Sequence, residues 1–342
     1  MKKISFNITA LFIFCTVIAF TSCRKDGDGS PGYKAGTPGT SIGIKPDSGS
    51  GGALLTLTGT GLGQMRSIVF DNKNVPAPFQ STLNTEENII FRVPDTAYGG
   101  PQNIIFTNAN GLTLKVPFRV LAYPVASTVF PTDFITGSLI TITGSNLDDV
   151  SSVVINGTTD GATIVSKARG QLVISMPSTA VTRGFLKITN ATGSIVTTQE
   201  MVNVAKATIV FDDALQNGFQ DWGWGGTYAP STDYKITGAK SLKAAYDPAG
   251  AWGGIQWGGG AIHLTTEKYF TFWAMGADVD VNVNVNLNWN NTKTITVPAK
   301  KWTYFKYNLA TDFPGTTDVG TVVYQINGSG KTIYLDNVMF VK

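Results

Sequence analysis

LLTLTGTGLGQMRSIVFDN (residues 54–72) returns further along the chain as LITITGSNLDDVSSVVING (139–157). A second pair of stretches, VPDTAYGGPQNIIFTNANG (93–111) and MPSTAVTRGFLKITNATG (176–193), repeats in the same order. Corresponding positions lie about 82 to 85 residues apart, which indicates a tandem duplication of one small domain. Both copies alternate apolar and polar residues between glycine-rich turns, and this pattern predicts two compact antiparallel β-sandwiches.

The motifs inside each copy are a strand, then TGTGLG or TGSNLD, a Val-Pro or Met-Pro turn, and a strand ending in Asn-x-x-Gly. They resemble the immunoglobulin-like IPT/TIG family over residues 40–122 and 123–205. Some members of that family bind DNA. Here the formal net charge is only +3 and no basic run occurs, so the composition argues against a nucleic-acid partner.

The N-terminus predicts an exported lipoprotein. Two lysines precede ITALFIFCTVIAF (8–20), an apolar stretch too short to span a bilayer comfortably. Thr-Ser before Cys23 resembles a bacterial lipoprotein signal, which implies a signal peptide over 1–22, lipidation of Cys23 and anchoring in the outer membrane at the cell surface. An ordinary secretory signal with a free Cys23 is the alternative. Residues 23–39, rich in Gly, Pro and Lys, are expected to be a flexible tether.

Composition changes abruptly after about residue 205. All seven tryptophans lie beyond this point, and the two repeats contain none. Residues 206–342 divide into nine short predicted strands without a helical period, which predicts a two-sheet jelly roll. We therefore expect an all-β protein, with two tandem immunoglobulin-like sandwiches followed by a β-jelly-roll sandwich.

The elements FDD, TGAKSLKAAY, AWGGIQW, YFTFWAMG, KKWTYFKYNL and IYLDNVMF follow one another in this last region. Their order resembles the jelly-roll carbohydrate-binding modules, and the resemblance implies glycan binding on a concave sheet or at the loop edge. The chemistry agrees with it. Pyranose rings stack their C–H faces on aromatic rings, and side-chain amides offer a donor and an acceptor to neighbouring hydroxyls.

The candidate carbohydrate-binding side chains are aromatic rings and amides. DWGWGG places Trp222 and Trp224 two residues apart, so both can project from one side of a loop. In AWGGIQW, Ile255 marks the core face, which puts Trp252 and Gln256 together on the other face. The full set of candidates is Trp222, Trp224, Trp252, Trp289, Tyr228, Tyr234, Gln256, Asn282, Asn284, Asn286 and Asn288.

VDVNVNVNLNWNN (279–291) alternates apolar and polar residues without interruption. Because asparagine is normally depleted from strands, we interpret its amide face as the polar floor of a glycan groove, with a plain solvated face as the alternative. Alternation places Trp289 on the side opposite the amides, at the strand end, where its ring can still reach a loop. Tyr228 and Tyr234 flank the tryptophan-rich loop and are expected to support it.

The resemblance to carbohydrate-binding modules also implies a structural Ca²⁺ ion. By motif matching, Asp212 of FDD and Asp336 of YLDNV occupy the positions that would supply its carboxylates, and hard oxygen ligands suit Ca²⁺. Ordinary strand-end aspartates are the alternative interpretation.

Catalysis is not expected. A glycosidase needs two carboxylates beside the bond it cleaves. Glu267 is the one glutamate of residues 206–342, and Asp280 is the one carboxylate in the amide face. The single histidine, His263, has no Cys or Glu partner at metal-ligand or triad spacing.

The sequence therefore predicts a lipid-anchored surface protein that binds a neutral polysaccharide non-covalently, with β-linked glucans or hemicelluloses as the first expectation. The resemblance implies an outer-membrane glycan importer and glycoside hydrolases as partners. A structural or adhesive protein whose last domain binds another protein is the second hypothesis, and a glycosidase that uses Glu267 or Asp280 is the third.

Overall fold

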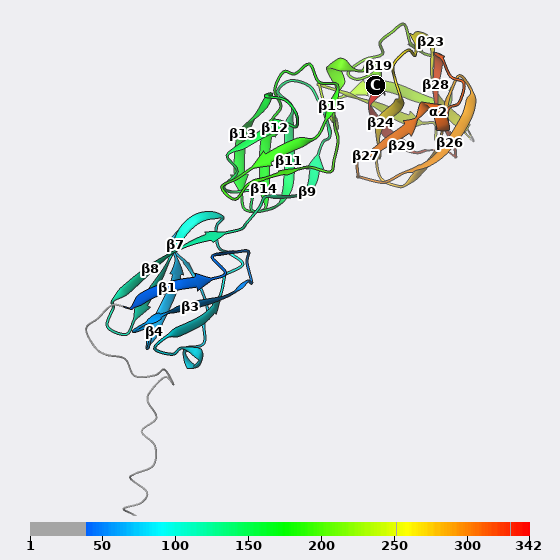
Figure 1. The fold of residues 1–342 in the computed structure, drawn as a ribbon. Coiled ribbons are helices and arrows are strands. Elements are labelled where there is room, and N and C mark those ends of the chain that lie inside the picture. The colour runs from blue at the N-terminus through cyan, green and yellow to red at the C-terminus, as the bar shows by residue number, and fades with distance from the viewer. Residues whose placement is uncertain (1–38, 251, 329) are drawn as a thin grey trace, which may run out of the picture. The chain divides into compact units, whose positions relative to one another are not determined.

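The computed structural model describes residues 39–250, 252–328 and 330–342. The predicted signal peptide, Cys23 and nearly all of the tether lie outside the described residues. Within the described part of the chain, no helix is long and apolar enough to cross a membrane. The chain forms two compact units, one ending at Ala122 and the other running from Tyr123 to Lys342, and the sheets of the second unit form two domains (Figure 1).

The first domain is a sandwich of a three-stranded sheet, β1-β3-β6, and a five-stranded sheet, β2-β8-β7-β4-β5. Leucine, isoleucine, valine and phenylalanine alternate along its strands and fill the space between the sheets. Its elements are β1 (Thr40–Lys45), β2 (Ser48–Gly49), β3 (Leu54–Thr60), β4 (Met65–Phe70), β5 (Val75–Pro76), the 3₁₀ turn η1 (Ser81–Leu83), β6 (Asn88–Arg92), β7 (Gly100–Asn108) and β8 (Thr113–Val120).

Domain 2 repeats this plan with a longer sheet, β17-β16-β12-β13-β14-β11-β9, and a short one, β10-β18-β15. Its core is again aliphatic, and it contains no tryptophan. Its elements are β9 (Val125–Phe130), β10 (Asp133–Phe134), β11 (Leu139–Ser145), β12 (Ser152–Ile155), β13 (Gly161–Ala168), β14 (Gln171–Ser175), β15 (Arg183–Gly184), β16 (Leu186–Thr189), β17 (Ser194–Val196), β18 (Met201–Asn203) and the 3₁₀ turn η2 (Val204–Lys206).

The C-terminal domain packs two sheets face to face. We call β20-β23-β28-β25-β26 the front sheet, and β21-β22-β29-β24-β27, with β19 paired to β29, the back sheet. The elements are β19 (Thr208–Phe211), β20 (Gln220–Asp221), β21 (Gly226–Ser231), β22 (Ser241–Tyr246), β23 (Trp252–His263), β24 (Tyr269–Gly276), β25 (Val281–Leu287), β26 (Asn290–Val297), β27 (Thr303–Asn308), α2 (Leu309–Asp312), β28 (Asp318–Asn327) and β29 (Thr332–Val341).

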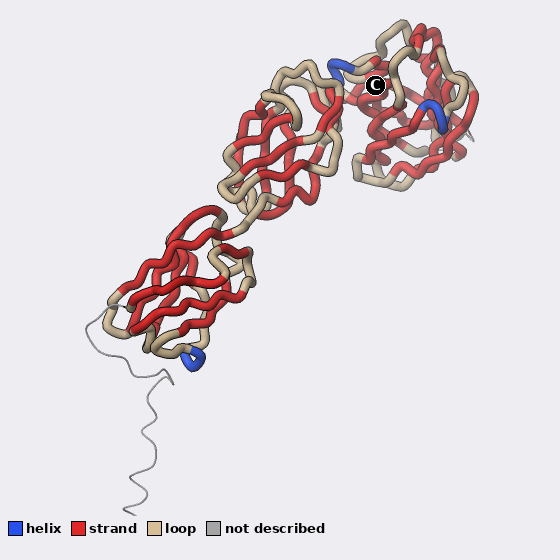
Figure 2. The backbone as a smooth tube through the Cα atoms, viewed as in Figure 1, coloured by secondary structure: helices blue, strands red, loops and turns tan. Residues whose placement is uncertain are grey.

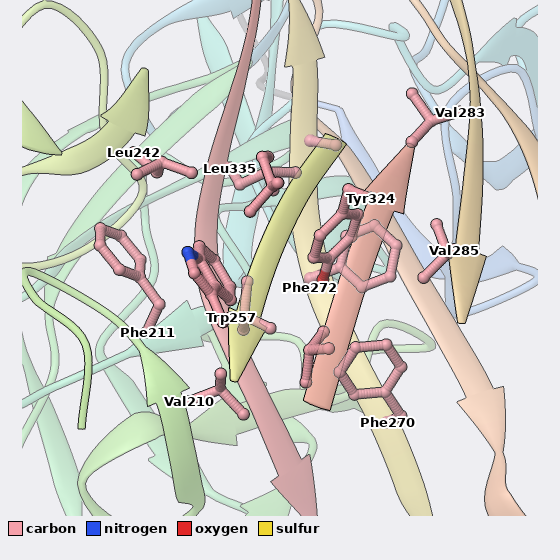
Figure 3. Close-up of a cluster of buried hydrophobic side chains, with 14 of the residues drawn as sticks. Val210, Phe211, Leu242, Trp257, Phe270, Phe272, Val283, Val285, Tyr324 and Leu335 are labelled. Atoms are coloured by element: carbon pink, nitrogen blue, oxygen red, sulfur yellow. The ribbon is translucent and has the colours of Figure 1, made fainter. Parts of the chain in front are cut away.

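The core of the C-terminal domain lies between its two sheets (Figure 3). Trp257 of the front sheet is fully buried and stacks on Phe211, with their ring centroids 5.5 Å apart. Tyr324 meets Phe272 of the back sheet edge to face at 5.1 Å. Burying each large side chain contributes about 1.5–3 kcal/mol, so these pairs fix how the sheets face each other.

The predicted all-β fold is confirmed, and strands dominate each domain (Figure 2). The structure corrects the expected strand map of the last domain in three places. The valine–asparagine strand ends at Leu287 rather than continuing to Trp289, short strands β20 and β21 border the tryptophan-rich loop, and one helical turn, α2, follows β27.

Candidate functional site

The two faces of β25 have different chemistry. Val281, Val283 and Val285 point into the core and are fully buried. The asparagines between them point to the outer face of the front sheet, where Asn282 is exposed and Asn284 is half-buried. Side chains alternate in direction along a strand, so the burial of the valines forces the asparagines between them onto one surface.

Neighbouring strands continue this polar surface across the front sheet. Asn284 is paired with Thr294 of β26 on one side and with Gln325 of β28 on the other. Gln325 is paired in turn with Gly254 of β23. Residues directly opposite each other in an antiparallel pair share a face, so these side chains form a row that runs across the strands.

The tryptophan-rich loop continues the pairing of β20 along the edge of β23. The backbone N–H of Trp224 donates to the Gly254 carbonyl at 3.0 Å, and the N–H of Gly254 donates back to the Trp224 carbonyl at 2.9 Å. The N–H of Trp222 donates to the Gln256 carbonyl at 2.8 Å. Trp222 and Trp224 therefore pair with residues of the outer face, and both rings project on that side of the sheet, as their spacing predicts.

Glycines seat both indole rings. A Cβ atom on Gly254 would lie 2.3 Å from the Trp224 ring, and one on Gly258 would lie 2.0 Å from the Trp222 ring. Real Cβ contacts are never this short, so each ring occupies the space that a side chain would fill. These two glycines were not among the residues predicted from the sequence. The signal was available, because both glycines fall in register with Trp252 and Gln256 on the outer face.

Trp289 reaches the same surface through a tight turn. Asn288 and Trp289 are the two loop residues between β25 and β26, and both have positive φ angles, 52° and 61°. This turn ends the alternation that placed Trp289 opposite the amides. Its ring centroid lies 5.8 Å from that of Trp224, with the planes inclined by 31°. A bulky residue in the left-handed region is strained, so presenting this ring lowers the stability of the folded domain.

One outward position at the centre of the front sheet is apolar. Val323 is fully buried although it points away from the core, because its strand neighbours Val322 and Tyr324 fill the core instead. Trp222 and Trp289 nevertheless keep 51% and 50% of their side-chain surface exposed. They thus present flat apolar area to solvent on a rigid base, which is the form of surface that stacks on a sugar ring.

Trp252 stands at the start of β23, on the same face as Gly254 and Gln256, and is 50% exposed. Gln256 is half-buried and paired with Val323. The structure therefore brings both residues to the outer face that carries Trp224. Trp257 and Trp273, in contrast, are buried.

Threonines of β26 orient the two outer asparagines. The Thr294 hydroxyl donates to Asn284 Oδ1 at 2.8 Å, and the Thr296 hydroxyl donates to Asn282 Oδ1 at 2.9 Å. Each threonine uses the acceptor end of an amide. No side chain among the described residues accepts from the Nδ2 atoms, which leaves two oriented donors for a hydroxyl-rich ligand.

The other two asparagines have different environments. Asn286 is 97% buried, and its Oδ1 atom has no hydrogen-bond partner among the described residues. Asn288 is committed to the scaffold: Oδ1 accepts from the backbone N–H groups of Gly320 and Thr321, and Nδ2 donates to the Asp318 carbonyl at 2.6 Å. Asn288 therefore holds the turn that presents Trp289.

The two predicted tyrosines are separated. Tyr228 donates from its hydroxyl to the Trp224 carbonyl at 2.7 Å, which supports the tryptophan-rich loop from β21. Burial, together with the Asp221 carboxylate, raises the pKa of Tyr228 to about 12, so this donor stays protonated. Tyr234 instead packs edge to face on Tyr334 of the back sheet, and the structure does not bring it to the tryptophans.

The predicted calcium ligands are engaged with N–H donors. Asp336 accepts from the backbone of Ile236 at 2.6 Å and of Asn337 at 2.9 Å. Asp212 accepts from Asp213 and from the Gln216 amide. Among the described residues, no three His, Cys, Asp or Glu side chains group where they could hold an ion. A calcium site built from these two carboxylates and backbone carbonyls stays a prediction.

The two carboxylates of the glycosidase hypothesis also accept hydrogen bonds from backbone N–H groups. Asp280 Oδ1 accepts from the N–H of Ala299 at 2.8 Å. Glu267 accepts from the N–H groups of Thr265 and Thr266 and from the Thr208 hydroxyl. Burial opposes its ionisation, but these hydrogen bonds outweigh burial and lower the pKa of Glu267, whereas a general acid needs a raised one.

Comparison with models of known protein families gives no match, and comparison with curated protein sequences gives none either. Solved structures do match. A surface glycan-binding protein of Prevotella bryantii is similar over 90% of this chain and 99% of its own, with a TM-score of 0.54 and 14% identity. A protein of a complex xyloglucan utilization locus in Bacteroides uniformis covers 90% and 98%, with a TM-score of 0.46 and 16% identity. The first likeness shows a shared fold along nearly the whole chain.

Proposed function

We propose that this protein binds a neutral polysaccharide on the outer face of its front sheet. The observation that carries the proposal is the contact of Trp289 with Trp224, whose ring lies on Gly254, beside a row of amides and hydroxyls on one surface. The rings would stack on sugar faces, and the oriented Nδ2 groups of Asn282 and Asn284 would donate to sugar hydroxyls.

The arrangement favours a chain of uncharged sugars. From Gly254 to Gly258 of β23, Thr321 to Gln325 of β28 and Asn282 to Asn286 of β25, the outward positions carry glycine, threonine, valine, glutamine and asparagine. The exposed pair of His263 with Asp318 lies at the far end of β23 and β28. A uronic or sulfated polymer would leave its charges unpaired on such a surface, which is costly when they are desolvated. The polar row crosses β23, β28, β25 and β26, so we expect an extended oligosaccharide to run across the strands. β-Linked glucans and hemicelluloses have the required flat, hydroxyl-rich form.

The cellular role we propose is capture at the cell surface. The N-terminal signal resembles that of a lipoprotein, and the protein of Prevotella bryantii with the same fold is named a surface glycan-binding protein. On a lipid anchor at Cys23, many copies could hold one polymer at once, and avidity would compensate for weak single sites. An outer-membrane importer and glycoside hydrolases would then receive the captured glycan. We propose no catalytic step.

Binding by the full chain to xyloglucan, mixed-linkage glucan, xylan and glucomannan tests the proposal, by affinity electrophoresis followed by calorimetry. We expect at least one to bind and Trp224→Ala to weaken it about 30-fold or more, since central aromatic residues contribute 2 kcal/mol or more to such contacts. Trp252→Ala should weaken it less. Tyr234→Ala is the matched control, equally exposed on the other sheet, and should bind as the wild type does.

Two results would overturn this assignment. If Trp224→Ala and Trp252→Ala both bind a glycan as tightly as the wild type, the binding face lies elsewhere. If the full chain binds none of the neutral glycans, the structural or adhesive role becomes the better explanation. Release of reducing ends that Glu267→Gln abolishes would favour the glycosidase.

A further inference from the structure

Domain 2 covers the part of the outer face of the back sheet that is formed by β24, β27 and β29. Trp273 of β24 meets Phe130 of β9 edge to face, with ring centroids 5.7 Å apart. Lys306 of β27 forms an ion pair with Glu200 at 2.9 Å. Trp273 is only 5% exposed. A large aromatic residue on the outside of a sandwich is buried here by the neighbouring domain rather than by its own core.

Apolar residues from both sides of the domain boundary close the same junction. Val202 and Val204, at the end of domain 2, pack with Met339 and Val341 of β29 in a buried cluster. This cluster is separate from the core of either domain. Since the chain passes through it at η2, the link between the two domains is itself part of a packed interface.

A buried carboxylate from domain 2 sits at the centre of the junction. Asp133 has no exposed surface, and its Oδ2 atom accepts from Asn337 Nδ2 at 3.2 Å. Asn337 is equally buried, and its Oδ1 atom accepts from the Thr237 hydroxyl at 2.8 Å. This chain of hydrogen bonds joins β10 of domain 2 to β29 and to the loop before β22.

The backbone of β29 is shaped for this contact. Asn337 has a φ angle of 47° inside the central strand of the back sheet, and the pairing of β29 with both β24 and β19 shifts register near it. An irregularity of this kind re-aims a side chain. Here the side chain it re-aims is the one that meets Asp133.

The duplication provides an internal comparison. β2 of the first domain pairs in parallel with β8 as β10 pairs with β18, which makes Ser48 the counterpart of Asp133. Ser48 donates to its neighbour Asp47. The two repeats share the local fold at this position, so the buried carboxylate is a feature of domain 2 and is not required by the sandwich.

We infer that domain 2 and the C-terminal domain form a single cooperative folding unit, joined through Asp133 and the aromatic contact of Phe130 with Trp273. Each side has buried groups that are satisfied only by the other: Asn337 would lose its acceptor, and Trp273 would lose its cover. Leaving such groups without their partners costs free energy of folding. The unfolding of one domain should therefore destabilise the other and cause it to unfold.

The tryptophan distribution makes this testable in the full chain. Because all seven tryptophans lie in the C-terminal domain, the bulk of the change in intrinsic fluorescence reports the unfolding of that domain, and Trp273, which is covered by domain 2, contributes the remainder. Ile142 of domain 2 and Leu57 of the first domain are matched positions of the two repeats, and both are fully buried. Ile142→Ala should lower the fluorescence-detected midpoint by about 5 °C or more, whereas Leu57→Ala should leave it unchanged.

Asp133→Ala should uncouple the two domains. The double variant Asp133→Ala, Ile142→Ala should then have the same fluorescence-detected midpoint as Asp133→Ala alone. Circular dichroism checks that each core substitution destabilises its own domain. If alanine prevents folding, Ile142→Val and Leu57→Val give the same comparison with smaller shifts. An unchanged fluorescence midpoint in Ile142→Ala or Ile142→Val, while circular dichroism shows domain 2 melting earlier, overturns the inference. This outcome does not depend on glycan binding.

Discussion

The two outer faces of the C-terminal domain both carry aromatic side chains, yet they differ in what covers them. On the back sheet, Trp273 is buried against Phe130 of domain 2. On the front sheet, Trp222 and Trp289 lie over the sheet with half their surface open to solvent. Aromatic content alone would not distinguish a junction from a binding surface. The distinguishing features are the glycines below the rings and the amides beside them, which only the front sheet provides.

Among substitutions that remove no binding side chain, the largest effect on the front face should follow from filling a glycine seat. Gly254→Ala places a methyl group where the Trp224 ring now lies, and it leaves every binding side chain present. We expect the ring to be displaced and glycan affinity to fall about 10-fold or more, measured by calorimetry. Gly161→Ala is the control, because its Cβ meets nothing closer than 3.9 Å. Unchanged affinity in Gly254→Ala would show that the seat does not position the ring.

Trp289→Gly should separate binding from stability. Glycine adopts a positive φ without penalty, so relieving the turn should raise the free energy of unfolding by about 1 kcal/mol, while loss of the ring should weaken glycan binding about 10-fold. Denaturant melts and calorimetry measure the two quantities. Asn291→Gly, at a φ angle of 52° in the same hairpin, should leave affinity unchanged. A less stable Trp289→Gly protein would contradict the strain argument.

The back-sheet junction should respond to pH. Burial raises the pKa of Asp133 to about 7, although the hydrogen bond from Asn337 opposes this rise; burial also raises the pKa of the facing Asp336 to about 8. Between about pH 4 and pH 7 the folded protein then binds more protons than the unfolded chain, so the free energy of unfolding falls as pH rises. The tryptophan-fluorescence midpoint should therefore decrease from pH 5 to pH 8. Asp133→Asn should flatten this decrease, and an equally steep profile in that variant would contradict the assignment.

The smallest effect concerns the amide row. Asn284→Ala should reduce affinity a few-fold, since one hydrogen bond contributes about 0.5–1.5 kcal/mol. Thr294→Val keeps the Asn284 amide but removes the hydrogen bond that orients it, so it should reduce glycan affinity less than Asn284→Ala does. Thr143→Val in domain 2, which removes a comparable surface hydroxyl, is the control. Equal affinity in all three variants would indicate that the row is only a solvated face.

The fold could be predicted because the duplication and the apolar–polar alternation are both visible in the order of the residues. The burial of Val281, Val283 and Val285 follows from alternation, and so does the shared side of Trp222 and Trp224. Alternation failed at Trp289 because the hairpin turns there through two left-handed residues, which the apolar–polar pattern does not record.

Proximity in sequence was the weaker guide to the site. Tyr234 follows the tryptophan-rich loop by few residues, but β21 has by then carried the chain into the back sheet. Asn288 looked like its neighbours in the amide series, although the turn uses its whole side chain. In both cases the deciding information is which partner strand lies alongside, and that is set by tertiary pairing.

The glycine seats have a consequence for how such a surface can change. Its rings at Trp222, Trp224 and Trp289 come from an edge loop and a hairpin turn. The strands beneath contribute glycines and amides to the outer face, and their other face packs in the core. Residues 220–226 and 288–291 could therefore be exchanged as cassettes without repacking the sandwich. A library restricted to these two segments should yield altered sugar preference on an unaltered scaffold.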